Sequence, residues 1–452
     1  MEKDKVVIKF GGVSLKNSER LKSTAKIIKN NLDKDLVVVI SAIGDSTNEL
    51  IKAGEKASNG RIDFKGVKTI HEEICSGLDL GFTLLEGLFL QIKKALECIK
   101  EEKQFSKKNN DLMMSFGEQL SIIVLSEYLK TQNIKAEGFN SWDIGLISDS
   151  NYGKAAILEK SSGLIKYNIE KIKRHNILPI VTGFISKESN GNITTLGRGG
   201  SDLTASYIAQ AIAAKRVILW KDVEGILTSD PKLVKNTRKI NCISYKEAAE
   251  MAYYGAEILH PQAIFPAMEK NIAVWIKNFL EPDAVGTKIV DAIDYLKEQS
   301  HIKTISYRTD ITLIHIESNR MLGHYGFLAR VFEVFDALKI SVDMIATSEV
   351  SISLTLDESH DLDTLKKALS HFAHVKITKE QSIISLIGNT EESTGIFNQA
   401  FDILDKHNIN IKMVSYGASH VNIGFIIDST RLEETINVLH DGMIFEEEVT
   451  VC

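Results

Sequence analysis

The sequence predicts an α/β protein: a mainly parallel, open sheet sandwiched by helices, followed by two smaller ferredoxin-like units. Up to about residue 290, short apolar strands alternate with longer amphipathic segments, which is typical of a sheet covered by helices on both faces. After residue 300 the order changes to β-α-β-β-α-β, and it occurs twice. We therefore expect a first domain at 1–290 and two further units at 301–380 and 381–452, with strand exchange between these two units left open.

Four runs in the first domain are apolar along nearly their whole length, as strands buried on both faces of a parallel sheet are. They are Val6–Phe10, Leu36–Ser41, Ile180–Ile185 and Val217–Trp220. The segments between them have helical spacing of apolar residues. The predicted helices include Ser18–Asn30, Ile70–Ile99, Gly117–Thr131, Ser162–His175 and Tyr245–Met251.

The C-terminal part contains an internal repeat. Residues 339–345 (KISVDMI) are echoed by residues 408–414 (NINIKMV), at the same place in each predicted unit. The units are predicted around helices Phe327–Leu338 and Leu362–Phe372, and Gly395–His407 and Arg431–Leu439. Two copies are too few for a solenoid, so we expect a paired regulatory or dimerisation module.

The composition excludes several classes of protein. The 452 residues are 44% hydrophobic and 25% charged, as in ordinary globular proteins, and the net charge of −6 argues against nucleic-acid binding. The four cysteines form no C-x-x-C pair, so we expect neither a zinc site nor a disulfide framework. Apolar runs are too short to span a membrane, and the charged first residues lack the apolar region of a signal peptide. We expect a cytoplasmic protein.

The most informative motif is Leu196-Gly-Arg-Gly-Gly-Ser-Asp202, which opens a predicted helix. Glycines let the backbone approach a ligand, and a helix N-terminus offers unpaired N–H groups to an anion. Ser201 is predicted to be the N-cap residue and Asp202 a first-turn acid, while Arg198 suits a carboxylate. The alternative is a tight loop before a capped helix.

A second motif follows the first predicted strand, where Lys9 precedes the paired glycines Gly11 and Gly12. Backbone N–H groups of such a loop, with a lysine as point charge, can hold a phosphate. No G-x-x-x-x-G-K-[ST] loop occurs, and no G-x-G-x-x-G follows a strand, so a dinucleotide cofactor has no support.

Two acidic residues have both a structural and a functional interpretation. Glu118 is expected in the first turn of its helix, where it either balances the helix dipole or accepts a substrate ammonium. Asp222 follows the strand Val217–Trp220, so it is either a turn former or a nucleotide or metal partner. His260, next to leucine and proline, is expected to be a packed histidine and not a catalyst.

The motifs, in their order along the chain, resemble those of aspartokinases, with the amino-acid-kinase fold and tandem ACT domains. The matching motifs are Lys9-Phe-Gly-Gly12, Ser41-Ala42, Thr47-Asn48, Ser115-Phe-Gly-Glu118, Gly197–Asp202, Trp220–Asp222, Asp230-Pro231 and Leu259-His-Pro261. The resemblance implies ATP-dependent phosphorylation of the β-carboxylate of L-aspartate, the first step toward lysine, threonine and methionine. It also implies Mg²⁺ accompanying ATP, with no protein side chain assigned to the metal.

Roles are carried over by matching position. The resemblance implies catalytic roles for Lys9 and Asp202. It implies that aspartate binds to Thr47, Glu118, Arg198 and Ser201. The implied nucleotide-binding residues are Lys9, Gly11, Gly12, Lys221, Asp222, Leu227, Asp230, Pro231 and Glu257. Val13, Leu227 and Glu257 depart from the family pattern of a hydroxyl residue, a tyrosine and a lysine.

The two ACT-like units imply feedback control by an end-product amino acid, with lysine the expected effector, and a homodimer, with a tetramer left open. The implied effector-binding residues are Met321, Phe327, Leu328, Ser341, Val342, Asp343, Thr347, Ser348 and Glu349. Two alternatives remain at this point: an amino-acid sensor with a decayed kinase site, or a sibling kinase acting on glutamate or N-acetylglutamate.

Overall fold

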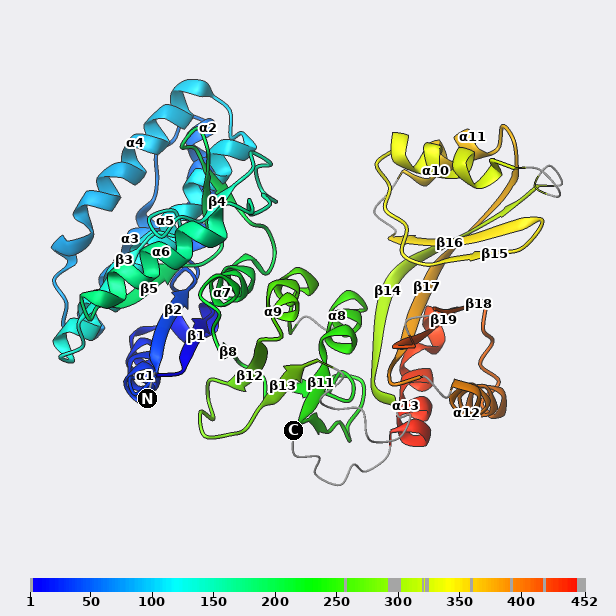
Figure 1. Ribbon diagram of the computed structural model, residues 1–452. Coiled ribbons are helices and arrows are strands. Elements are labelled where there is room, and N and C mark those ends of the chain that lie inside the picture. The colour runs from blue at the N-terminus through cyan, green and yellow to red at the C-terminus, as the bar shows by residue number, and fades with distance from the viewer. Residues whose placement is uncertain are drawn as a thin grey trace.

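The computed structural model describes residues 3–255, 258–291, 302–318, 321, 325–357, 361–390, 393–417 and 420–444. A large α/β body holds the N-terminal part of the chain, and a region built around long strands holds the C-terminal part (Figure 1). The predicted fold class is confirmed. The sequence also predicts a short helix at Asp291–Gln299, and most of it falls in the segment 292–301, which lies outside the described residues.

The body is built on an eight-stranded sheet in the order β11-β13-β12-β8-β1-β2-β5-β3. Its neighbouring strands are parallel except for the pair β12 and β13. The strands are β1 Lys5–Phe10, β2 Asp35–Ile40, β3 Ala136–Phe139, β5 Leu178–Thr182, β8 Arg216–Lys221, β11 Cys242–Ser244, β12 Ala273–Asn278 and β13 Thr287–Val290. Smaller pairings join β4 Ile147–Ser148, β6 Ile185–Glu188 and β7 Ile193–Thr195, and β9 Ile226–Leu227 with β10 Lys239–Ile240.

Helices cover both faces of this sheet because its strand residues alternate between two apolar cores. Val6 and Ile8 of β1 enter the core beneath the first group of helices, whereas Val7 enters the opposite core. The first group is α1 Ser18–Lys29, α2 Ser46–Ser58, α3 Lys65–Gly77, α4 Glu86–Glu102 and α5 Lys107–Thr131. The second group is α6 Ser161–Arg174, α7 Gly200–Ala211, α8 Tyr245–Tyr253 and α9 Phe265–Glu269.

Three predicted elements were wrong in extent. The segment Ile70–Ile99 is two helices, α3 and α4, separated near residues 78–85. The segment Ile180–Ile185 is interrupted at Gly183, so that β5 and β6 belong to different sheets. The helix predicted from Gly117 begins ten residues earlier, because Ser106 caps it by accepting a hydrogen bond from the Asn109 N–H.

The C-terminal region is one six-stranded sheet in the order β15-β16-β14-β17-β19-β18. Two of its strands, β14 and β17, are long enough to cross both repeats. The lower half of β14 (302–308) pairs with the second half of β17, and its upper half pairs with the first half of β17 and with β16. Both long strands change backbone conformation where the halves meet, with positive φ at Asp310 and Glu380.

The described elements follow the predicted order in the first unit and, in the second, as far as its second helix; the last strand predicted there, near 448–451, lies outside the described residues. The described elements are β14 Ile302–Glu317, α10 Phe327–Ala337, β15 Ile345–Thr347, β16 Ser351–Asp357, α11 Leu362–Leu369, β17 His374–Gly388, α12 Ser393–Lys406, β18 Met413–Tyr416, β19 Asn422–Asp428 and α13 Leu432–Met443. Figure 1 shows α10 and α11 at one end of the sheet and α12 and α13 at the other.

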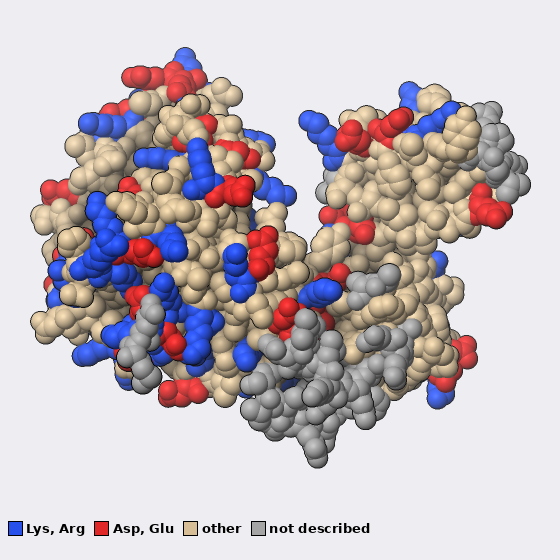
Figure 2. Space-filling view, in the orientation of Figure 1, with Lys and Arg blue, Asp and Glu red and all other residues tan. Residues whose placement is uncertain are grey.

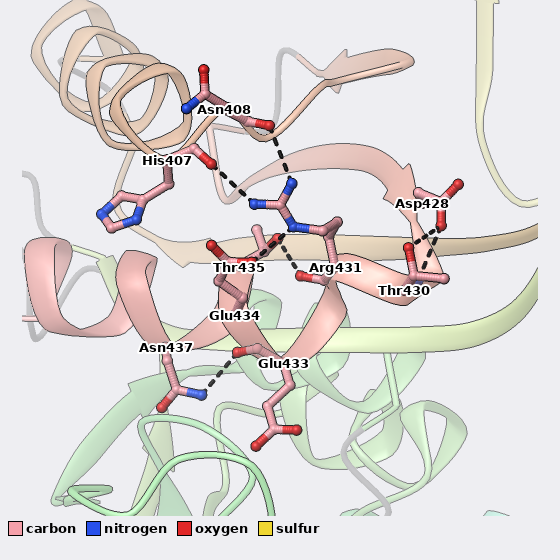
Figure 3. Close-up of polar contacts among 9 residues, drawn as sticks. All are labelled: His407, Asn408, Asp428, Thr430, Arg431, Glu433, Glu434, Thr435 and Asn437. Atoms are coloured by element: carbon pink, nitrogen blue, oxygen red, sulfur yellow. Dashed lines mark hydrogen bonds and ion pairs between the residues drawn. The ribbon is translucent and has the colours of Figure 1, made fainter.

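Arg431 joins the two helices of the second unit. Its guanidinium donates hydrogen bonds to the carbonyls of His407 (3.0 Å) and Asn408 (3.3 Å), just after the end of α12. It also pairs with Glu434 at 2.8 Å (Figure 3). A cation at this end of a helix satisfies carbonyl groups that lack helical partners. The side chain therefore fixes the start of α13 against the end of α12.

The cysteines agree with the prediction only in part. Cys75 and Cys98 are free, whereas Cys242 is disulfide-bonded, which the sequence analysis did not predict. In the ranges given above, none of the helices combines the length and apolar character needed to cross a membrane.

Candidate active site

A cavity of about 1000 Å³ lies where the ends of β1 and β8 meet the start of α7. Seven residues predicted for substrate or nucleotide line it together: Lys9, Thr47, Glu118, Arg198, Ser201, Asp202 and Lys221. Residues from the C-terminal region close its far side. Figure 2 shows the surface hollowed between the α/β body and the upper part of that region.

Asp202 holds two lysines at the centre of the cavity. Its carboxylate contacts Lys9 Nζ at 2.7 Å and Lys221 Nζ at 2.6 Å, and its side chain is only 4% exposed. The lysines meet because β1 and β8 are adjacent, with Lys9 paired to Leu219. Burial opposes ionisation of Asp202, but the two ammonium groups outweigh burial and hold its pKa at about 2. Burial lowers the pKa of Lys9 against the attraction of Asp202.

The glycine after the first strand makes room for this arrangement. A β-carbon at Gly11 would lie 3.1 Å from Lys9 Nζ. The backbone there is extended, so the glycine is needed for space and not for an unusual conformation. The N–H groups of the loop that follows lie beside a lysine already held in position, which is the arrangement that a phosphate needs.

The Arg198 loop is shaped by two glycines in the left-handed region, Gly197 (φ +75°) and Gly199 (φ +74°). A β-carbon at Gly199 would lie 2.3 Å from His260 Cβ, so this glycine also permits close packing of His260. Burial, together with Arg198 and Lys154, lowers the pKa of His260, so the ring stays neutral near pH 7. His260 is only partly buried and also lines the cavity, so the expected packed histidine is not confirmed.

The predicted N-cap was wrong. The helix α7 begins at Gly200, and its N-cap residue is Gly199, which makes no side-chain cap. Ser201 therefore lies inside the first turn, where its hydroxyl accepts a hydrogen bond from the Ser41 hydroxyl at 2.9 Å. Asp202 is in the first turn, as predicted.

Glu118 lies in the middle of α5 and not in a first helical turn, so the helix-dipole interpretation was wrong. The side chain is buried, and one carboxyl oxygen accepts a hydrogen bond from the Ala42 N–H at 3.3 Å. The other oxygen has no hydrogen-bond partner within the described residues. Burial raises the pKa of Glu118 to about 8. A buried carboxyl facing a polar cavity with an unused oxygen suits a cationic ligand.

The other described residues predicted to bind the nucleotide do not line the cavity, although Gly11 lies next to Lys9 Nζ. They are Gly11, Gly12, Asp222, Leu227, Asp230 and Pro231. Asp222 is exposed after the end of β8. Glu257 lies outside the described residues.

The loop that carries Leu227 and Asp230 is held by the C-terminal region. Tyr307 Oη donates to Asp230 Oδ2 at 2.9 Å, and Thr304 Oγ1 donates to the Leu227 carbonyl at 3.1 Å. The backbone N–H of Ile305 donates to the Thr228 carbonyl at 2.9 Å. The lower half of β14 thus lies directly against the predicted nucleotide loop.

The structure separates the predicted effector residues. Ser341 and Asp343 line the cavity, whereas Phe327, Val342 and Met321 pack in or against the apolar core of the first unit. Leu328, Thr347, Ser348 and Glu349 are exposed. Asp343 is already engaged: Arg308 Nη1 donates to it at 3.0 Å and Tyr253 Oη at 2.7 Å.

Several cavity residues were missed by sequence reasoning. Lys154, Tyr253, Arg308 and Asp357 all line the cavity, and Arg308 bonds to Asp357 as well as to Asp343. None lies in a glycine-rich motif, and Asp357, although it ends β16, lies in the C-terminal region and not in the parallel sheet. Only the three-dimensional pairing of β14 with its neighbours brings Arg308 to this place.

The site lacks the side chains of a protein-held metal centre among the described residues. No group of three or more His, Cys, Asp or Glu side chains suited to a metal ion occurs in the part of the chain that the structure describes. Asp202, a buried acid of the cavity, is already paired with two lysines. A metal ion at this site would therefore take its ligands mainly from a bound phosphate group.

Comparisons with known proteins identify the families that the two parts of the chain match. Residues 4–278 match the model of the amino acid kinase family, and residues 314–372 and 384–443 match the ACT domain. The fold and the cavity thus define an amino acid kinase with regulatory ACT domains.

Individual relatives narrow the class. The chain is 38% identical to "Aspartokinase 1, chloroplastic" of Arabidopsis thaliana, covering 96% of this chain and 79% of that protein. It is 32% identical to "Lysine-sensitive aspartokinase 3" of Escherichia coli, covering 97% and 99%. The crystal structure of E. coli aspartokinase III in complex with aspartate and ADP superposes with a TM-score of 0.81 at 31% identity, covering 98% of this chain and 100% of that one. The chain belongs to the aspartokinase family.

Proposed function

We propose that this protein transfers the γ-phosphoryl group of ATP to the β-carboxylate of L-aspartate, giving 4-phospho-L-aspartate. The observation that carries the proposal is the convergence of Lys9, Lys221 and Asp202 with Glu118 and Arg198 in one cavity. Cations for two anionic reactants and an acid for an ammonium are thus present together. A sibling kinase for N-acetylglutamate would have no use for buried Glu118, since its substrate has no free ammonium.

In this proposal the protein binds both the α-carboxylate and the α-ammonium group of aspartate. Arg198 clamps the α-carboxylate through its planar fork, and Glu118 accepts the α-ammonium. Thr47 and Ser201 complete the pocket with hydroxyl groups. The ionised Glu118 becomes favourable only when the ammonium is present, because in the empty site burial holds its pKa at about 8.

Phosphoryl transfer then needs no general base. The β-carboxylate of aspartate is ionised at neutral pH, so catalysis consists of alignment and charge neutralisation. Lys9 and the N–H groups of Gly11 and Gly12 hold the transferring phosphate, and Asp202 keeps Lys9 and Lys221 in place. The residues proposed to bind the nucleotide are Lys221, Asp222, Leu227, Asp230 and Pro231. Glu257 is added to them on the basis of sequence alone.

Mg²⁺ enters with ATP, bound through the phosphate oxygens. When bound, it neutralises charge on the γ-phosphoryl group. The two lysines on Asp202 fit this proposal, because they leave the phosphates as the main source of metal ligands.

Regulation by lysine is supported by the ACT match and by the name of the E. coli relative. Asp343 is the acid that would face the lysine side chain, in competition with Arg308. We also propose that the protein forms a homodimer through its ACT units and is located in the cytoplasm. The kinase domain is proposed to end at about residue 290. A tetramer remains the alternative assembly.

A hydroxamate assay with ATP, Mg²⁺ and aspartate tests the activity. We expect a signal that depends on aspartate and falls when lysine is added. A protein that binds amino acids but gives no hydroxamate with aspartate, glutamate or N-acetylglutamate would instead be a sensor with a decayed kinase site. A signal with glutamate or N-acetylglutamate but not with aspartate would indicate the sibling kinase.

A further inference from the structure

Asp111 is a buried carboxylate that the proposed reaction does not use. It lies in α5, its side chain is 0% exposed, and burial raises its pKa. It nevertheless accepts three hydrogen bonds: from the Gly153 N–H (2.9 Å), the Thr195 N–H (2.8 Å) and the Thr195 hydroxyl (2.9 Å). A buried carboxylate is costly, so its bonds to two separate loops need an explanation.

Both donors come one or two residues before cavity residues. Thr195 ends β7 and is followed by Leu196, Gly197 and Arg198, while Gly153 precedes Lys154. The two loops also contact each other. The Ala155 N–H donates to the Thr195 carbonyl at 2.9 Å, and a β-carbon at Gly197 would lie 3.2 Å from the Gly153 carbonyl oxygen. Asp111 thus binds the backbone of both loops at the point where they approach the cavity.

The same helix carries Glu118, seven residues further along. At about 1.5 Å per residue, Asp111 and Glu118 are roughly 10 Å apart along the axis of one rigid helix. Every contact that fixes the Arg198 loop to Asp111 therefore fixes it relative to Glu118. Arg198, which binds the α-carboxylate, and Glu118, which binds the α-ammonium, are 80 residues apart in the chain. Asp111 provides a direct polar link between the two segments that carry them.

We infer that Asp111 is a positioning residue for the amino-acid substrate: it sets the place of Arg198 relative to Glu118 through Thr195, and so determines the affinity for aspartate. This inference rests on the proposed function, in which Arg198 and Glu118 bind the two α-substituents. It assigns Asp111 no contact with either reactant. Its effect is therefore expected on the aspartate KM and much less on the ATP KM or kcat.

Thr195 offers a cleaner test than Asp111, because replacing a buried carboxylate can prevent folding. Thr195→Val removes only the hydroxyl donor to Asp111, and Thr195→Ser keeps it. Thr194→Val is a matched control: Thr194 is equally buried and its hydroxyl is also bonded, but to Ser148 at 2.6 Å. All three variants and Asp111→Asn are assayed in the full chain, with melting temperatures measured in parallel.

We expect Thr195→Val to raise the aspartate KM about tenfold, as loss of a buried bond to a charged group does, with the ATP KM and kcat within about twofold. Thr195→Ser and Thr194→Val should keep the wild-type aspartate KM, and Asp111→Asn should exceed the effect of Thr195→Val. An unchanged aspartate KM in Thr195→Val, or an equal rise in Thr194→Val, would overturn the positioning role. A wild-type protein without aspartate-dependent activity would refute the proposed function itself, and this inference with it.

Discussion

The hydroxyl of Tyr307 donates a hydrogen bond to the carboxylate of Asp230 at 2.9 Å, although the two residues are 77 positions apart. The next residue on the same strand, Arg308, bonds to Asp343 at 3.0 Å. Successive side chains of a strand point to opposite faces. One strand therefore contacts the proposed nucleotide loop on one side and the proposed effector acid on the other.

Replacing Tyr307 with phenylalanine should weaken nucleotide binding. The change removes one hydrogen bond and leaves the Asp230 carboxylate without this donor, so the loop is held less firmly. We expect the ATP KM to rise about threefold to fivefold, with the aspartate KM unchanged, in steady-state assays. Tyr167→Phe, on an exposed surface, is the control. A change confined to the aspartate KM would mean that this loop does not serve the nucleotide.

Arg308 and Asp343 allow a test of the effector site. If lysine competes with Arg308 for the Asp343 carboxylate, Arg308→Gln should lower the half-inhibitory lysine concentration about fivefold. Asp343→Asn should raise it at least about tenfold, because a charge-assisted bond is lost. Inhibition curves at fixed substrate measure both.

The second unit supplies the control for this pair. Lys412 holds the position in the repeat that matches Asp343, so Lys412→Gln should leave inhibition unchanged. Inhibition curves of Arg308→Gln and Asp343→Asn that coincide with the wild-type curve would exclude Asp343 from the effector site.

The raised pKa of Glu118 predicts a pH-dependent affinity for aspartate. Below about pH 8 the empty site holds a neutral carboxyl, which must lose its proton before it pairs with an ammonium. The aspartate KM should therefore fall about fivefold between pH 7 and pH 8 and level off above. Initial rates across this range measure it.

The same group makes folding stability fall as the pH rises, whereas the affinity for aspartate increases. The pKa of Glu118 is about 8 in the folded protein against 4.5 for an ordinary glutamate, so the unfolded chain loses this proton first. The ligand-free protein then loses stability as the pH rises from about 4.5 to about 8. Glu118→Gln should remove this loss in thermal melts, raise the aspartate KM and flatten its pH profile. A wild-type KM that does not vary with pH would contradict the prediction.

Arg198→Ala should raise the aspartate KM about a hundredfold, because a bidentate contact to a carboxylate is lost, and should change the ATP KM far less. Substrate-saturation curves for each reactant measure the difference. Arg61→Ala, at an exposed side chain paired with Asp63, serves as the control. A larger effect on the ATP KM than on the aspartate KM would indicate that Arg198 binds the nucleotide and not aspartate.

The central site could be predicted because its residues lie in local motifs at strand ends. Lys9 lies near the end of an apolar strand, Arg198 lies in a glycine-rich turn, and Asp202 lies in the first turn of the helix that follows. Parallel strands bring such turns to one edge of the sheet, so the chain order alone indicates that they meet. Lys221, whose nucleotide role only the resemblance implied, also lines the cavity, as the last residue of β8.

Other features depend on contacts that no local pattern records. Arg308 reaches the cavity only through the pairing of β14 with β16 and β17. The first-turn placement of Glu118 failed because the polar run before it, including Lys107 to Asn110, belongs to the same helix. The N-cap at Ser201 failed because Gly199, in a left-handed conformation, ends the turn two residues earlier.

The shared sheet of the C-terminal region limits how this protein can be recombined with its relatives. Residues 302–308 complete the sheet of the second repeat, although they precede the first repeat in the chain. A chimera with a junction near residue 380 would therefore combine strands from two parents in one layer. Exchange of the second repeat should succeed only when the donor also supplies the segment before the first.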